Sequence, residues 1–222
     1  MIDAEKIRSR RFTVVLDCIN GAGSVIAPEL LERLGVRVIP LNCDVDGNFY
    51  RDPEPTPHNL VDLVDAVKKS GADLGFATDP DADRLALVTG HLSARAISEE
   101  YTLALAIDQV MGHDRGDVVV NLSTSAWVDH VAKKHGVRVH RTPVGEAHVV
   151  DRMLKEKAVI GGEGNGGVIY PRLHAGRDAM VGMALILQLL AETSLTLDEA
   201  VRRYPPLVIS KAKVALGGTF SP

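Results

Sequence analysis

Long hydrophobic runs, clustered cysteines and an abundance of aromatic residues are all missing from this sequence. The longest apolar stretch, residues 179–191, contains Gln188 and is too short to span a bilayer, so we expect a buried helix there and no membrane partner. The two cysteines, Cys18 and Cys43, form no CxxC motif, which favours a reducing cytoplasm over a disulfide framework. The stretch 1–12 has no apolar core segment, so we expect no signal peptide.

A strong charge of either sign is also missing. The chain carries 25 Lys and Arg against 29 Asp and Glu, and its basic residues are scattered along the sequence. A nucleic-acid surface needs a basic patch or stripe, so nucleic acid is not an expected partner. What the chain does have is 222 residues that are 45% apolar, enough for one large domain or two ordinary ones.

Strand-like and helix-like segments alternate along the chain. β-branched runs predict strands at 12–17, 36–41, 73–78, 84–88, 117–123, 137–144, 158–162 and 168–170. Apolar residues at helical spacing predict helices at 25–35, 60–71, 98–112, 125–136, 146–157 and from 178 onward. Such alternation implies parallel strands joined by crossover helices. The sequence therefore predicts an α/β fold of two consecutive three-layer α/β domains, with mixed, mainly parallel sheets, over residues 1–112 and 113–222.

Three aspartates, Asp79, Asp81 and Asp83, directly follow the predicted strand 73–78. Their charges repel one another unless a cation lies among them or they point into water. The carboxyl end of a strand is where open α/β sheets bind ligands, and carboxylate oxygens are the ligands that Mg²⁺ prefers. We therefore predict a Mg²⁺ site at these three residues.

Spacing alone leaves other interpretations of this segment. An EF-hand loop would need glycine and glutamate where Arg84 and Gly90 stand, so it is excluded. A phosphatase with an aspartate nucleophile would need threonine or valine where Asp83 stands. A solvated acidic turn without any ligand stays open.

A glycine-rich segment, residues 161–171, is the second unusual stretch. Its glycines let backbone approach a ligand, while Glu163 and Asn165 offer groups that suit sugar hydroxyls. A glycine-rich hairpin without a ligand is the alternative. Nearby, Arg177 stands just before a predicted helix, where it either contacts an anion or pairs with an acidic residue.

Four motifs in this order resemble the α-D-phosphohexomutase family, which includes phosphoglucomutase, phosphomannomutase and phosphoglucosamine mutase. The motifs are NGAGS (20–24), DPDADR (79–84), RTPVGEAHVV (141–150) and GEGNGG (162–167). The resemblance extends from about Ile2 to about Lys213. It implies a fold of four domains around a cleft, of which this chain would supply domain 2 with the metal loop and domain 3 with the sugar-recognition loop.

The resemblance also implies an activity. Enzymes of this family move phosphate between the 1- and 6-positions of a hexose through a phosphoserine and a bisphosphorylated sugar. The three aspartates would bind Mg²⁺ together with the serine phosphate, and Arg84 would be catalytic, close to that phosphate. Glu163, Asn165 and Arg177 would bind the hexose phosphate substrate.

The chain departs from the family pattern in several places. It contains no Ser-His dipeptide of the phosphoserine loop and no R-x-S-G-T-like phosphate loop. We therefore expect a phosphohexomutase fragment whose partners are the missing phosphoserine and C-terminal domains, with little activity of its own. Asn165 replaces the usual serine and Gly167 the usual histidine, which leaves the preferred hexose open. A non-catalytic sugar-phosphate or metal-binding module and a Mg²⁺-dependent phosphatase with Asp79 as its nucleophile are the alternatives.

Overall fold

The computed structural model describes residues 2–208, so the end of the second expected domain, Lys213 included, lies outside the described residues. The first half of the chain contains α1 (Ala4–Arg10), β1 (Thr13–Asp17), α2 (Gly23–Arg33), β2 (Arg37–Leu41), the 3-10 helix η1 (Pro57–Asn59), α3 (Val61–Ser70), β3 (Leu74–Thr78), β4 (Leu85–Thr89) and α4 (Glu100–Met111). The second half contains β5 (Val118–Asn121), α5 (Trp127–His135), β6 (Val139–Thr142), α6 (Glu146–Glu156), β7 (Ile160–Glu163), β8 (Gly167–Ile169), α7 (Ala179–Thr193) and α8 (Leu197–Val201).

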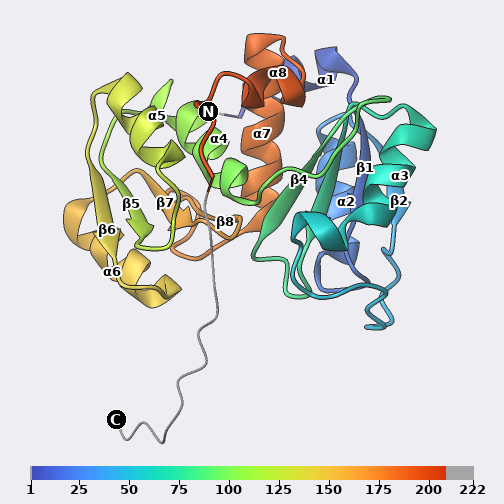
Figure 1. Ribbon diagram of the computed structural model, residues 1–222, viewed down its shortest axis with the longest axis horizontal. Coiled ribbons are helices and arrows are strands. Elements are labelled where there is room, and N and C mark those ends of the chain that lie inside the picture. The colour runs from blue at the N-terminus through green and yellow to red at the C-terminus, as the bar shows by residue number, and fades with distance from the viewer. Residues whose placement is uncertain (1, 209–222) are drawn as a thin grey trace, which may run out of the picture.

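Two four-stranded sheets with the same topology form the framework (Figure 1). Their strand orders are β2-β1-β3-β4 and β6-β5-β7-β8. In each sheet three strands are parallel, and the last strand pairs antiparallel with its neighbour. The prediction of two α/β units with mixed, mainly parallel sheets is therefore confirmed.

Helices cover both faces of the first sheet. Side chains alternate along a strand, so Val14 and Leu16 of β1 point to one face and Val15 to the other. The first face packs against α1, α2 and α7, and the second face packs against α3. Burial on both faces explains why β3 and β4 consist entirely of buried residues.

The second sheet is layered in the same way. Val118 and Val120 of β5 contact α4 and α5, whereas Val119 lies against α6. Each sheet is therefore the middle of three layers, as the alternation of predicted strands and helices implied.

Two helices cross between the halves of the chain. Helix α4 places Leu105 in the core of the first sheet, but Leu103 and Ile107 in the core of the second. Helix α7, which comes from the second half, buries Met183 against the first sheet and Leu185 against the second. Figure 1 shows α4 and α7 together between the two sheets. The two halves therefore share a continuous apolar contact, and a domain boundary at 112 stays a prediction.

Two short helices were not predicted from periodicity. Helix α1 buries only Ile7, and α8 spans a single turn or little more, so neither gives a repeated apolar pattern. A local signal for α8 was present, because Thr196 and Glu199 form a capping box. Among residues 2–208 no helix combines the length and apolar character needed to cross a bilayer.

Candidate active site between two hairpin loops

The predicted metal and sugar loops occupy equivalent positions in the two sheets. Residues 79–84 connect β3 to the antiparallel strand β4, and residues 164–166 connect β7 to the antiparallel strand β8. The loops meet where the Leu85 N–H donates a hydrogen bond of 3.1 Å to the Gly166 carbonyl. One polar region therefore contains both segments singled out in the sequence.

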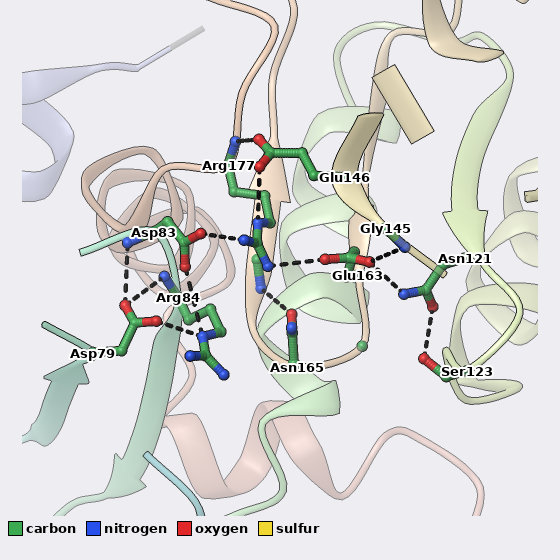
Figure 2. Close-up of polar contacts among 12 residues, drawn as sticks. Asp79, Asp83, Arg84, Asn121, Ser123, Gly145, Glu146, Glu163, Asn165 and Arg177 are labelled. Carbon is green, nitrogen blue, oxygen red and sulfur yellow. Dashed lines mark hydrogen bonds and ion pairs between the residues drawn. The ribbon is translucent and has the colours of Figure 1, made fainter. Parts of the chain in front are cut away.

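Asp79 organises the metal loop from its buried position after β3. Its Oδ1 accepts hydrogen bonds of 3.1 Å from the backbone N–H groups of both Asp83 and Arg84. Its Oδ2 accepts one from the Arg84 Nε, as Figure 2 shows. Ala82 at the turn has a φ of 59°, a left-handed conformation that is costly for a residue with a side chain. The Asp79 carboxylate therefore holds a strained turn in place.

The loop gathers the three predicted metal ligands. One ligand atom each of Asp79, Asp81 and Asp83 lies within 4.8 Å of the others. Asp81 is exposed, and the Asp83 Oδ1 is buried but accepts no hydrogen bond from any described residue. Burial is the largest cause that raises the pKa of the Asp83 carboxyl to about 7, and the negative charge of Asp79 is the second. The positive charge of Arg177 lowers this pKa but does not cancel the increase. The Asp83 Oδ1 lies 3.6 Å from the Arg84 Nε, so its contact with that guanidinium is an ion pair. Converging carboxylates with an oxygen that accepts no hydrogen bond fit a hard divalent cation such as Mg²⁺.

Arg84 connects the metal loop to a distant loop. Its NH1 lies 2.5 Å from the Glu54 Oε2, in the proline-rich segment 43–60. In the same segment, the Arg51 side chain donates to the buried Asp17 carboxylate at 2.8 Å and to the Thr78 carbonyl at 2.6 Å. The alternating prolines of this segment exclude a long α-helix, but they do not show what the loop contacts.

Glu163, the last residue of β7, is buried where the sugar loop begins. Its Oε1 accepts hydrogen bonds from the Asn121 Nδ2 at 2.7 Å and from the Gly145 N–H at 3.1 Å, and its Oε2 lies 2.8 Å from the Arg177 NH1. Asn165 Oδ1 accepts from the Gly167 N–H at 3.3 Å. No sequence motif marks Asn121, although it is the last residue of the parallel strand β5, at the sheet edge where ligands bind.

Gly166 allows the two loops to approach. Its φ is +95°, and a Cβ there would lie 2.5 Å from the Leu85 carbonyl oxygen. A side chain at this position would push the loops apart, so the glycines that suggested ligand access also serve the packing of one loop on the other.

Arg177 lies between the two loops, just before α7. Its guanidinium forms ion pairs with Asp83 and Glu163, and its Nε lies 3.4 Å from the Glu146 Oε2. Of the two roles considered from sequence, pairing with acids is what the structure contains. Contact of Arg177 with substrate stays a prediction, as do the ligand roles of Glu163, Asn165 and the three aspartates and the catalytic role of Arg84.

A second group of metal-ligand side chains is already balanced by an arginine. The His140 Nε2 lies 2.7 Å from the Asp117 Oδ2, and its Nδ1 lies 3.2 Å from the Arg152 NH2. The same NH2 lies 2.9 Å from the Glu156 Oε1. The Arg152 guanidinium is positively charged and donates to His140 and Glu156, so it already occupies the position that a metal ion would need. We therefore assign no metal to this group.

Comparison with known proteins identifies the family to which these two α/β units and their facing loops belong. The family model described as phosphoglucomutase/phosphomannomutase, alpha/beta/alpha domain II matches residues 1–108, and that for alpha/beta/alpha domain III matches residues 98–207. The chain belongs to the phosphoglucomutase/phosphomannomutase family and comprises its domains II and III.

Individual relatives agree with this assignment. The chain is 39% identical to a phosphoglucomutase/phosphomannomutase of Thermococcus kodakarensis, over 96% of this chain and 46% of the relative. It is 34% identical to a probable phosphoglucosamine mutase of Methanopyrus kandleri, over 100% of this chain and 49% of that relative. The chain thus spans about half the length of these curated relatives.

Solved structures share the fold. A putative phosphomannomutase from Thermus thermophilus superposes with a TM-score of 0.82 at 28% identity, over 91% of this chain and 47% of that one. An Aspergillus fumigatus N-acetylphosphoglucosamine mutase in complex with GlcNAc-6P and magnesium has a TM-score of 0.65 at 18% identity, over 92% of this chain and 52% of that one. At that identity the second likeness shows the fold alone.

Proposed function

We propose that this chain supplies the metal-binding and sugar-binding loops of a phosphohexomutase that interconverts hexose 1-phosphate and hexose 6-phosphate. The observation that carries the proposal is the contact between the loop of Asp79, Asp81 and Asp83 and the loop of Glu163 and Asn165. Family membership supports the same activity. In this proposal the phosphoserine that carries phosphate, and the second phosphate-binding loop, belong to the remaining domains of the enzyme.

Each loop has a chemical task in this proposal. Mg²⁺ bound at the three aspartates would neutralise charge on the phosphoryl group during transfer. Arg84, whose NH1 faces the half-exposed Glu54, adds a guanidinium beside that phosphoryl group. Glu163 is fixed by Asn121, Gly145 and Arg177, so its carboxylate has one orientation from which to bind sugar hydroxyls.

The phosphatase alternative has less support. Its nucleophile would be Asp79, but both oxygens of that buried carboxylate already accept hydrogen bonds from the metal loop. The loop also has Asp83 at the position where that type of phosphatase has threonine or valine. No observation in the described residues favours the phosphatase over the mutase.

A chimaera tests the proposal. The chain replaces domains II and III of the Thermococcus kodakarensis relative, and conversion of glucose 1-phosphate to glucose 6-phosphate is measured with Mg²⁺. We expect activity in the chimaera, its loss with Asp81→Asn, and its retention with Asp65→Asn, which removes the same charge from an exposed position on α3. An inactive but folded chimaera, or equal loss in both variants, would count against the proposal. Full activity of the present chain alone would contradict the separate phosphoserine domain.

A further inference from the structure

The Arg177 side chain is a physical connection between the two loops. One end of its guanidinium pairs with Asp83 of the metal loop, and the other end lies 2.8 Å from the Glu163 Oε2 of the sugar loop. Figure 2 shows the guanidinium between the two carboxylates. Among the described residues, no other side chain has ion pairs with both loops.

Local structure keeps Arg177 in this position. Its backbone N–H donates to the Glu146 Oε1 at 2.7 Å, and the residue forms an isolated β-bridge with Ile169. A Cβ on Gly167 would lie 2.4 Å from the Arg177 Cδ. The glycine that departs from the family's usual histidine therefore leaves the space through which the arginine stem passes.

Negative charge exceeds positive charge around this guanidinium. Two arginines, Arg84 and Arg177, form ion pairs with five carboxylates, those of Glu54, Asp79, Asp83, Glu146 and Glu163. A carboxylate oxygen of Asp81 lies within 4.8 Å of one from Asp79 and one from Asp83. A divalent cation at the metal loop and the Arg177 guanidinium therefore attract the same carboxylate, Asp83.

We propose that Arg177 is a positioning residue that holds Asp83 until a divalent cation takes that carboxylate, and that this exchange couples the metal loop to the sugar loop. When Asp83 turns to the cation, the guanidinium remains bound to Glu163 and Glu146 alone. The coupling is reciprocal, so a ligand that draws Glu163 away from Arg177 changes the affinity for the cation by the same factor. The exchange rests on the proposed function, because it requires the metal to bind at this loop.

Metal affinity is the first test. Mn²⁺ binding to the chain is measured by electron paramagnetic resonance at about pH 8. Removing one positive charge about 4–6 Å from a divalent ion should strengthen binding about ten- to thirtyfold in Arg177→Gln, for a dielectric close to that of water. The matched control is Arg172→Gln, which removes an arginine that is 60% exposed and paired with Asp114, and it should bind as the wild type does. Damage to the site would weaken binding, so an unchanged or weaker affinity in Arg177→Gln overturns the exchange.

Communication between the loops is the second test. The Gly145 amide reports on Glu163, to which it donates a hydrogen bond of 3.1 Å. Mg²⁺ should shift its NMR signal in the wild type and in Arg172→Gln, but not in Arg177→Gln. Arg177→Lys keeps the charge but lacks the planar fork, so it should bind Mn²⁺ nearly as the wild type does and lose most of the shift. A full Gly145 shift in Arg177→Gln overturns the coupling.

A metal-free cycle separates this inference from the proposed function. Asp83→Asn and Glu163→Gln are made singly and together, with and without Arg177→Gln, and urea midpoints are compared. We expect the two changes to be non-additive only where Arg177 is present. Additive changes in both backgrounds overturn the coupling even if metal binds. Absence of Mn²⁺ binding, with a non-additive cycle, overturns the metal site and the exchange but leaves Arg177 as the connection between the loops.

Discussion

The carboxyl group of Asp83 lies beside Asp79 and Arg177, and its Oδ1 accepts no hydrogen bond from any described residue. Its pKa of about 7 results from burial and the Asp79 charge, and it exceeds the value of about 3.9 that an aspartate has in an unfolded chain. The folded protein therefore binds this proton more tightly than the unfolded one. The stabilising contribution is complete below about pH 4 and is lost as pH rises through about 7.

Asp83→Asn tests this pH dependence. The amide is neutral at every pH, so the variant does not lose stability through this group as pH rises. In the presence of EDTA, the melting temperature of the variant minus that of the wild type should therefore increase from about pH 5 to about pH 8. Thermal melts followed by circular dichroism measure the difference. Asp65→Asn, at an exposed site on α3, should show no such trend. A difference between Asp83→Asn and wild type that does not depend on pH would contradict the assignment.

At the scale of elements, α7 connects the metal loop to both sheets. Its first residue, Ala179, donates its N–H to the Ala82 carbonyl in the strained turn at 3.1 Å. Asp178 caps the helix by accepting from the Met180 and Val181 N–H groups. The helix then continues with buried residues on nearly every side, which explains why its sequence is apolar throughout rather than striped.

Leu187→Ala measures how much α7 contributes to stability. Leu187 is fully buried in the core of the first sheet, so we expect a loss of about 2–5 kcal/mol in the free energy of unfolding. Leu154→Ala, at a position of α6 that is 62% exposed, should change stability by less than about 0.5 kcal/mol. Urea denaturation of both variants gives the comparison. Equal effects would mean that α7 is not a structural part of the first core.

At the scale of the whole molecule, the duplicated strand order brings two equivalent hairpin loops together. Helices α4 and α7 pack against each other and against both sheets. The active-site candidate therefore depends on an interface that neither half forms alone.

Dividing the chain tests this dependence. Residues 1–112 alone would lack α7 and would expose the face of α4 that contains Leu103 and Ile107, so we expect no cooperative melting from this fragment. The chain of residues 1–208 should unfold in one transition, because the shared helices join the two cores. Differential scanning calorimetry measures both. Two separated transitions in the longer chain, or a cooperative transition in the fragment, would show that the halves are independent.

Much of the fold was determined by local pattern. Amphipathic helices such as α6 have apolar residues at helical spacing. The run that forms β3 is short and buried at every position, so its length rather than its spacing indicated a strand. The order of these elements then favoured parallel sheets. Short helices were missed because α1 has a single buried residue and no period.

The sequence by itself also determined which residues carry the candidate chemistry. Asp79, Asp81 and Asp83 follow a strand, and Glu163 lies within a run of glycines, and these placements can be seen without a structure. Only the tertiary structure decided that Arg177 joins Asp83 to Glu163. An ion pair between residues far apart in the chain produces no repeating sequence pattern from which it could be predicted. The pairing of the two loops follows from the packing of α4 and α7, which depends on shape and burial across the whole molecule.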